Sequence, residues 1–301
     1  MTNINNPMKL AIIANGLPRA KNKKQLADIE NRLKNDQIDC EIHMATHHNH
    51  AIEIAMGLPV KHYDAIASLG GDGTNFQMLN GLLSANDPAS LPPLAILPSG
   101  RGNSFAKDLG IETMEDGLSA LARRSPRAVD VCRFTQGEAS HYFVNLMGLG
   151  FVTDVAKTAE HFRWAGDASY VAGVIYRAMT LSFHWMELEI DGKIMRGKNC
   201  FVEICNSTRT GGNMIMAPSA KIDDGFFDVV VGGPVSRGSL LGTLPKIFKG
   251  THGENPAITF HRGKSLKIRT KPAKQLLPDG EVFGFTPAEV DIMPGLVRYF
   301  S

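Results

Sequence analysis

Two glycine-rich turns carry the residues best suited to binding a phosphate. The first, Gly70–Thr74 (Gly-Gly-Asp-Gly-Thr), follows the apolar run Ala65–Leu69, which has the length of a buried strand. Apolar residues then recur at helical spacing, so the turn is expected at a helix N-terminus, where free N–H groups favour anions. The glycines are expected to take positive φ angles and to let a ligand approach the backbone. Because Asp72 would repel a bare phosphate, the turn predicts a polyphosphate with a metal ion, which indicates a nucleotide.

The second turn, Ser99–Asn103, follows the apolar run Leu94–Leu97 and leads into a helical pattern that ends at Leu109. Asn103 or Ser104 is expected to cap that helix, and Arg101 could reach a phosphate with its planar set of donors. Each turn alone is also typical of a plain strand-to-helix connection. Two of them at the strand ends of one sheet favour a phosphate site.

Two acidic turns lie in the C-terminal half. Asp223-Asp224-Gly225 precedes an apolar strand, and Asp279-Gly280-Glu281 follows Leu277-Pro278. A carboxylate with nearby backbone carbonyls is a ligand set that Mg²⁺ prefers. Both sequences are equally typical of hairpin turns, and their spacing alone does not choose between the two interpretations.

Histidines and cysteines are the other residues that could bind a metal. Four of the ten histidines lie in one stretch: His43, His47, His48 and His50. We expect a solvated loop there, because no well-spaced cysteine or carboxylate is evident to complete a metal site. The four cysteines are scattered and are expected to be free thiols in a reducing cytoplasm.

Composition excludes several classes of protein. The chain has 301 residues, of which 43% are hydrophobic and 21% charged, as in a soluble globular protein. The net charge is +2 with scattered Lys and Arg, so nucleic acid is not an expected partner. No apolar stretch approaches the roughly 18–20 residues of a membrane-spanning helix. The first seven residues lack the pattern of a signal peptide, which favours a cytoplasmic location.

Alternating strand and helix patterns over the first half would position the two turns. Four apolar strand-like runs, each followed by a turn or helical pattern, predict a doubly wound parallel sheet covered on both faces. Ligands of such sheets bind at the carboxyl ends of the strands, where Asn15, Thr46 and both glycine turns fall. Past about Ala128, short strands with turn punctuation predict an antiparallel sandwich or barrel. No long linker separates the halves.

These motifs together resemble the catalytic domain of the diacylglycerol kinase family, in particular its soluble bacterial lipid kinases. The resemblance covers nearly the whole chain in register. The matching segments are Gly70–Thr74 with Asn80-Gly81-Leu82; Leu97-Pro98 with Gly100, Asn103, Phe105-Ala106 and Leu109-Gly110; Gly211-Gly212 with Ala217-Pro218, Ala220 and Asp224-Gly225; Asp279-Gly280-Glu281; and Pro294-Gly295.

The resemblance implies an α/β nucleotide-binding domain over residues 1–128, completed by the tail 295–301. It implies a β-sandwich-like domain over residues 129–294 that binds the lipid substrate and a metal, with the active site in the cleft between the domains. The implied reaction uses ATP and Mg²⁺ to phosphorylate a hydroxyl of diacylglycerol, a related glycerolipid or a sphingoid base.

Residue roles follow from the same resemblance. Asp279 corresponds to the general base, so Asp279→Asn is expected to stop transfer and to leave folding nearly intact. The Mg²⁺ site corresponds to Asp224 with the carbonyls of Lys221 and Phe226, and Asp72 would reach that metal through water. The nucleotide contacts correspond to Asn15, Thr46, Gly70, Gly71, Asp72, Gly73, Thr74, Gly100 and Arg101.

Two departures from the family keep alternatives open. The family usually has threonine at the position of Arg101 and aspartate at that of Ser104. It also tends to have Asn-Pro and a later glycine where the first strand here ends in Asn15-Gly16-Leu17-Pro18. NAD kinases also carry Gly-Gly-Asp-Gly-Thr, and a non-catalytic lipid- or nucleotide-binding protein could keep the fold. Asp279-Gly280-Glu281 favours the lipid enzymes.

A lipid acceptor implies transient contact with the inner face of a membrane. The segments His161–Trp164 and Tyr170–Arg177 could form an apolar patch for this contact, although a helix packed on the core is the favoured interpretation. The identity of the lipid and the oligomeric state, including a homodimer, stay open.

Overall fold

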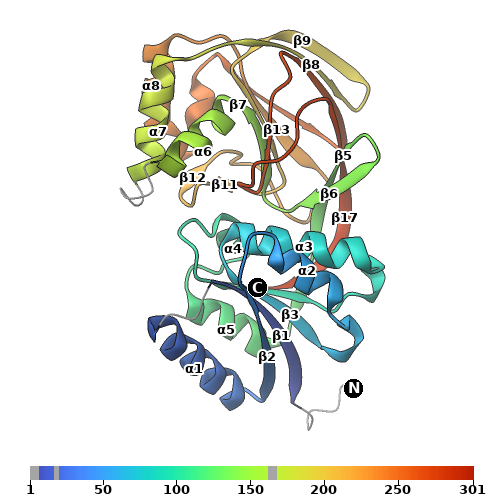
Figure 1. Ribbon diagram of the computed structural model, residues 1–301. Coiled ribbons are helices and arrows are strands. Elements are labelled where there is room, and N and C mark those ends of the chain that lie inside the picture. Colours follow the sequence, from blue (N-terminus) through green and yellow to red (C-terminus); the bar gives the residue numbers. More distant parts are fainter. Residues whose placement is uncertain (1–6, 17–19, 162–167) are drawn as a thin grey trace. The chain divides into compact units, whose positions relative to one another are not determined.

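The computed structural model describes residues 7–16, 20–161 and 168–301 of the chain (Figure 1). The chain divides into two compact units. The first unit holds the residues up to Val129 together with Gly295–Ser301, and the second holds Asp130–Pro294.

The first unit is built on a parallel sheet with strand order β2-β1-β3-β4, to which the end of β17 is added. Its strands are β1 (Met8–Asn15), β2 (Ile38–Ala45), β3 (Ala65–Gly70) and β4 (Leu94–Pro98). Every residue of β3 and β4 is buried, because helices cover both faces of the sheet. The predicted doubly wound sheet is therefore confirmed.

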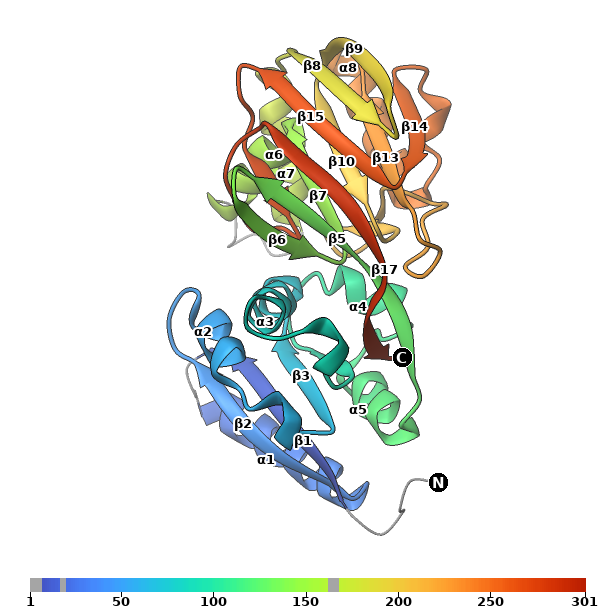
Figure 2. The same ribbon diagram turned by 90° about the vertical axis from the view of Figure 1, so that its right-hand side faces the viewer.

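Five helices surround this sheet (Figure 2). They are α1 (Ala20–Asn35), α2 (His50–Gly57), α3 (Asp72–Ala85), α4 (Ser104–Asp108) and α5 (Met114–Arg123). Helices α2 and α3 contact each other on one face, whereas α1 and α5 contact each other on the opposite face. The helices thus cover the two faces of the sheet, and the turns that follow the strands lie at its carboxyl edge.

The C-terminal strand β17 (Ala288–Phe300) ends in the first unit, where Tyr299 pairs with Leu94 of β4 in parallel. Tyr299 is fully buried, its hydroxyl donates to Asn75 Oδ1 at 3.0 Å, and its ring meets Phe105 edge-on. The last residues of the chain therefore belong to the core of the first unit.

The second unit contains two sheets of mainly antiparallel strands. One sheet runs β6-β5-β17-β15-β8-β9, and the other runs β14-β13-β10-β7-β16. The strands are β5 (Pro126–Gln136), β6 (Ala139–Phe143), β7 (Leu146–Gly150), β8 (His184–Ile190), β9 (Lys193–Asn199), β10 (Phe201–Cys205), β13 (Phe227–Gly232), β14 (Ile258–Gly263), β15 (Ser265–Lys271) and β16 (Leu276–Pro278). A short ribbon joins β11 (Arg209–Thr210) to β12 (Met214–Ile215).

Burial patterns explain the layers of this unit. In β15 exposed and buried residues alternate, as expected for a sheet with one face in water. In β7, β10 and β13 every residue is buried. Helices α6 (Phe151–His161), α7 (Ala168–Met179) and α8 (Arg237–Lys249) pack beside the second sheet. Val152 of α6 and Ile247 of α8 join its apolar core, and α7 contacts α6 and α8. The predicted β-sandwich-like second domain is confirmed.

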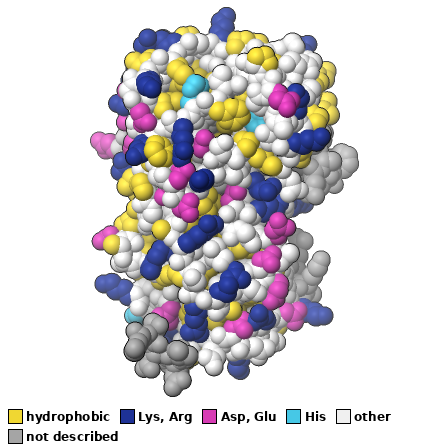
Figure 3. All heavy atoms as spheres, turned by 180° about the vertical axis from the view of Figure 1, so that it is seen from behind, with side chains coloured by type: hydrophobic (Ala, Val, Ile, Leu, Met, Phe, Trp, Pro, Cys, Tyr) yellow, Lys and Arg dark blue, Asp and Glu magenta, His cyan; other side chains and the backbone are white. Residues whose placement is uncertain are grey.

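The surface carries both signs of charge. On the face shown in Figure 3, Lys and Arg side chains are interspersed with Asp and Glu over both units. That distribution agrees with the small net charge of +2.

Candidate nucleotide and phosphotransfer sites

The two glycine turns of the first unit pack against each other, backbone to backbone. The carbonyl of Gly70 accepts hydrogen bonds from the N–H groups of Ser99 (2.9 Å) and Gly100 (3.2 Å). A Cβ added at Gly100 would lie 2.5 Å from the Cα of Gly71, a distance that real Cβ atoms do not adopt. The expectation of positive φ is wrong for these glycines, since Gly71 has φ of −103° and neither Gly70 nor Gly100 is in the left-handed region. Close approach of the two turns is what requires glycine here.

Asp72 joins the same two turns through its carboxylate. Oδ2 accepts from Ser104 N at 3.0 Å and Oδ1 from Phe105 N at 3.2 Å, so Asp72 caps α4 across 32 residues of sequence. The expected cap by Asn103 or Ser104 is wrong, because Asn103 makes no capping bond and its amide donates to the Gly100 carbonyl. Burial raises the pKa of Asp72, and the two N–H bonds oppose that rise. The carboxylate thus has a structural role that needs no metal.

The N-terminus of α3 is the better anion-binding end. Its N-cap residue is Gly71, and no side chain caps the helix. The first-turn N–H groups of a 14-residue helix with no side-chain cap attract a phosphate. The start of α4, in contrast, already has a carboxylate bound to two of its N–H groups.

A cavity of about 190 Å³ lies at the carboxyl ends of the parallel strands. It is lined by Ala14, Asn15, Gln25, Leu26, Met44, Leu69 and Ser99. Asn15 is thus the predicted nucleotide contact that this cavity contains. Thr46 and Arg101 are exposed on loops that follow β2 and β4.

Asp279 of the second unit is buried and firmly held. Its carboxylate accepts N–H bonds from Val144 (3.1 Å), Asn145 (2.9 Å) and Leu146 (3.1 Å), and its own N–H donates to the Leu146 carbonyl. The residue is 5% exposed and has φ of +47°, in the left-handed region. Both oxygens are therefore engaged, and any proton that the carboxylate accepts competes with these bonds.

Asp224 lies in the turn before β13 and is paired with a cation. Oδ1 accepts from Phe226 N at 3.1 Å, and Oδ2 forms an ion pair with Arg262. The guanidinium of Arg262 and the ammonium of Lys264 lie 4.4 and 4.7 Å from the centre of the Phe226 ring. Carboxylate and carbonyl oxygens suit Mg²⁺, but two cations already occupy this surface. The residues present do not fit a resident Mg²⁺ while Arg262 holds Asp224.

Sequence reasoning missed Asp130, which supports that turn. It is buried in β5, and its Oδ2 accepts from Gly225 N at 2.6 Å while its N–H donates to the Ile222 carbonyl. A lone aspartate between Val129 and Val131 was the available signal, because a charge in an apolar strand needs a partner.

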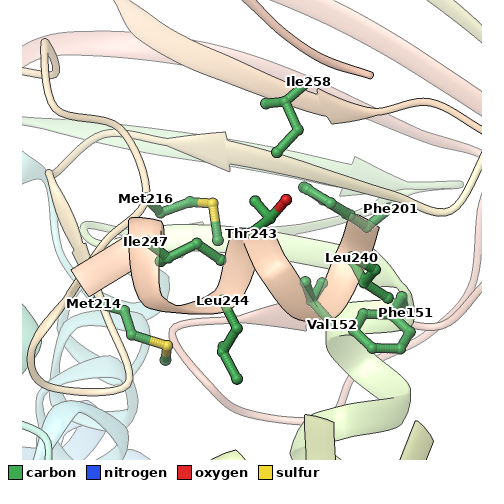
Figure 4. Close-up of a pocket in the computed structure, with 10 residues that line it drawn as sticks. All are labelled: Phe151, Val152, Phe201, Met214, Met216, Leu240, Thr243, Leu244, Ile247 and Ile258. Atoms are coloured by element: carbon green, nitrogen blue, oxygen red, sulfur yellow. The ribbon is translucent and has the colours of Figure 1, made fainter. Parts of the chain in front are cut away.

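An apolar pocket in the second unit was also missed (Figure 4). Its cavity volume is about 40 Å³, and it is bounded by α6, α8, β10, β14 and the β12 ribbon. Its lining residues are Phe151, Val152, Phe201, Met214, Met216, Leu240, Thr243, Leu244, Ile247 and Ile258. The Thr243 hydroxyl donates to the Ser239 carbonyl and accepts from Asn255, so it is already engaged. The pocket therefore offers apolar contacts.

Glu203 is a buried acid on β10, two residues from Phe201 of that pocket. It is 2% exposed, and its Oε2 has no hydrogen-bond partner among the described residues. Burial raises the pKa of Glu203 from 4.5 to about 8. The folded protein therefore keeps a proton on this group over a pH range in which the unfolded chain releases it.

Glu203→Gln is expected to make stability less dependent on pH. The folded state binds more protons than the unfolded state between about pH 4.5 and 8, so the free energy of unfolding of the wild type falls as pH rises through that window. Glutamine does not titrate, so the variant has no such loss. At pH 8 its free energy of unfolding should be higher than that of the wild type by about 1–3 kcal/mol. Urea unfolding at pH 5.5 and 8, with Glu138→Gln in an exposed turn as control, measures the effect. An equal difference from wild type at both pH values would contradict it.

Comparison with known proteins places this geometry in a class. Residues 9–134 match the model of the diacylglycerol kinase catalytic domain, and residues 145–301 match that of the YegS C-terminal NAD kinase beta sandwich-like domain. A doubly wound unit with paired glycine turns, followed by this sandwich, defines a class of two-unit kinases. The chain belongs to the diacylglycerol kinase catalytic-domain family, in the form that carries the YegS-type C-terminal domain. The resemblance predicted from the motifs is confirmed.

Individual relatives agree with this assignment. A diacylglycerol kinase of Bacillus subtilis is 25% identical, covering 89% of this chain and 87% of the relative. Sphingosine kinase 1 of Arabidopsis thaliana is 25% identical, covering 94% and 70%. Both relatives are named as lipid kinases.

Two solved structures share the fold. A Bacillus anthracis diacylglycerol kinase has a TM-score of 0.75 at 22% identity, covering 97% of this chain and 96% of that one. An Archaeoglobus fulgidus NAD kinase in complex with ATP has a TM-score of 0.54 at 12% identity, covering 98% and 94%.

Proposed function

We propose that this protein is an ATP- and Mg²⁺-dependent lipid kinase that transfers the γ-phosphate to a lipid hydroxyl. The acceptor is diacylglycerol, a related glycerolipid or a sphingoid base. The first unit binds ATP through the cavity at Asn15 and the N-terminus of α3. Asp279 of the second unit takes the proton of the attacking hydroxyl. Such transfers depend mainly on positioning and charge neutralisation.

The apolar pocket is the observation that favours a lipid as the acceptor. The described residues that line it bring one hydroxyl, and that hydroxyl is bonded to Ser239 and Asn255. An acyl chain gains free energy by leaving water for such a surface, at about 0.8 kcal/mol per buried methylene. A charged dinucleotide would lose its hydration there without new partners. The pocket therefore favours a lipid over NAD.

Magnesium enters this proposal as the companion of ATP. Mg²⁺ neutralises the phosphates of a bound nucleotide. We keep Asp224 and the carbonyls of Lys221 and Phe226 as the proposed ligands, on the condition that Arg262 releases the Asp224 carboxylate.

Access to a lipid requires contact with a membrane. Within the described part of the chain, no helix is long and apolar enough to span a bilayer. Large apolar side chains are exposed on α7 and α8: Ile175, Tyr176, Met179, Leu241 and Phe248. They support peripheral contact with the inner face of a membrane. Phe162, Arg163 and Trp164 of the expected apolar patch lie outside the described residues.

The test is phosphate transfer from γ-labelled ATP to mixed micelles of diacylglycerol, monoacylglycerol or sphingosine, and separately to NAD. Label is expected in an organic-soluble product only when Mg²⁺ is present. Label on NAD would support the NAD kinase alternative instead. Bound ATP with no labelled product would leave a non-catalytic binding protein.

Leu244→Trp is expected to lower transfer to a long-chain acceptor about tenfold or more, because the indole fills the apolar pocket that Leu244 lines. Lys249→Trp is the matched control, since Lys249 lies on the same helix, is exposed, and belongs neither to the pocket lining nor to the apolar side chains proposed for membrane contact. Transfer to a short-chain acceptor should change little in either variant. Equal losses of transfer in both variants would show that the pocket does not bind the acceptor.

A further inference from the structure

The backbone segment 144–146, whose N–H groups hold the Asp279 carboxylate, is itself bound by a second residue, Asn206. Asn206 directly follows β10 and is fully buried. Its side-chain amide donates to the Val144 carbonyl at 2.8 Å, and its backbone N–H donates to the Asn145 carbonyl at 2.9 Å. The segment thus has a carboxylate on its N–H groups and an asparagine on its carbonyl groups.

Asn206 and Asp279 bind the same two peptide groups. The carbonyl of Val144 and the N–H of Asn145 belong to one planar peptide group, and the carbonyl of Asn145 and the N–H of Leu146 belong to the next. In each group the carbonyl accepts from Asn206, and the N–H donates to Asp279 Oδ1, at 2.9 and 3.1 Å respectively. Because the C=O and N–H of a trans peptide point in opposite directions, a rotation that breaks one of these bonds also breaks the other.

The bonds from Asn206 also make the N–H groups better donors. A carbonyl that accepts a hydrogen bond draws electron density from its own amide, so hydrogen bonds in a chain polarise one another. Ser207 adds to this effect, since its N–H donates to the Asn145 carbonyl at 3.1 Å. The N–H groups that face Asp279 are therefore both oriented and strengthened as donors to an ionised carboxylate.

The orientation of the Asn206 amide is fixed by its acceptors. Nδ2 donates to the carbonyls of Val144 and Asp130, so a reversed amide would place an oxygen against two carbonyl oxygens. Oδ1 is buried and has no hydrogen-bond partner among the described residues. An unpaired buried acceptor lowers stability, so the need for two donors at this position outweighs that loss.

The second side-chain bond of Asn206 joins segment 144–146 to the turn before β13. Asn206 donates to the Asp130 carbonyl at 2.9 Å. Asp130 in turn binds that turn twice, through the N–H of Gly225 and the carbonyl of Ile222. One amide therefore connects the backbone that holds Asp279 with the turn that carries the proposed metal ligand.

We propose that Asn206 is a positioning residue for phosphate transfer. It fixes the two peptide groups that hold Asp279 and keeps them aligned with the turn before β13. The inference rests on the proposed function, because it takes Asp279 as the general base. Since Asn206 is buried and acts through the backbone of the second unit, its loss should lower the rate of transfer and leave ATP binding by the first unit unchanged.

The experiment compares Asn206→Ala with Asn199→Ala in the full chain, at a temperature at which circular dichroism shows each variant to be folded. Asn199 is the matched control, because it is a buried amide of the same unit whose side chain donates to the Gly197 carbonyl within β9. The substrate is the lipid that the wild type phosphorylates, in mixed micelles with γ-labelled ATP. We expect Asn206→Ala to lower kcat about tenfold or more and to leave the KM for ATP within about twofold of wild type.

Asn199→Ala should keep both values. Amide hydrogen exchange of residues 144–146 should be faster than wild type in Asn206→Ala only. Asn206→Ser keeps one donor, so its kcat should lie between those of the wild type and Asn206→Ala. The serine variant also tests the inference if the alanine variant does not fold.

The inference is overturned if the folded Asn206 variants have the wild-type kcat, or if Asn199→Ala loses as much of its kcat as Asn206→Ala does. A parallel assay of Asp279→Asn separates this failure from that of the proposed function. Loss of transfer in Asp279→Asn, with the wild-type kcat in Asn206→Ser, would overturn the positioning role alone. The wild-type rate in Asp279→Asn would overturn the proposed base, and the positioning role with it.

Discussion

Asp279→Asn is expected to abolish phosphate transfer and to lower the free energy of unfolding by about 1–3 kcal/mol. The carboxylate accepts three N–H bonds from residues 144–146, and the amide group of asparagine would turn a donor toward at least one of them. The expectation from the sequence, that this change leaves folding nearly intact, is therefore wrong on this geometry. Urea unfolding and initial rates of transfer measure the two effects.

Asp191→Asn is the matched control for Asp279→Asn. Asp191 also has a left-handed backbone, with φ of +46°, and its carboxylate accepts N–H bonds from Lys264 and Ser265. The Asp191→Asn variant should have a free energy of unfolding lower by about 1 kcal/mol, and its transfer rate should equal that of the wild type. If the folded Asp279→Asn variant transferred phosphate at the wild-type rate, Asp279 would not be the general base and its role would be structural.

Gly100→Ala is expected to weaken ATP binding about tenfold or more and to lower the free energy of unfolding by about 1–3 kcal/mol. The new methyl group would lie 2.5 Å from Gly71 Cα and 2.8 Å from Asn103 Oδ1, so the second turn must move away from the first. The bonds from Ser99 and Gly100 to the Gly70 carbonyl would then lengthen. Calorimetric titration with ATP and urea unfolding are the measurements.

Gly57→Ala serves as the control for Gly100→Ala. Gly57 ends α2, and a methyl group added there would contact nothing within 4 Å. Its stability should stay equal or rise slightly, because alanine favours helix. If Gly100→Ala bound ATP as tightly as Gly57→Ala does, the close packing of the turns would have no part in nucleotide binding.

Apolar runs bounded by turns were sufficient to predict the class of fold. The runs at β1, β3 and β4 are short and largely apolar, and burial on both faces of a parallel sheet favours that pattern. Likewise, alternating exposure in β15 agrees with the predicted antiparallel sandwich, whose sheets each have one face in the core.

Contacts between distant side chains and backbone groups were not predictable from such patterns. The bonds from Asp72 to the start of α4 join residues 32 positions apart, and no local propensity encodes them. The apolar pocket combines residues from two helices and three strands whose individual patterns all indicate plain core. The predicted roles of the site residues stay predictions, since a residue's type does not fix its partners, as the pairing of Asp224 with Arg262 illustrates.

The position of Tyr299 in the first unit affects the order in which the protein can fold on the ribosome. Domains generally fold from the N-terminus as the chain emerges, but this unit lacks a strand until the last residues of β17 have been translated. The hydrogen bond from the Tyr299 hydroxyl to Asn75 can form only after more than two hundred further residues have been synthesised. The unit that is begun first is therefore completed last, after every strand of the second unit already exists.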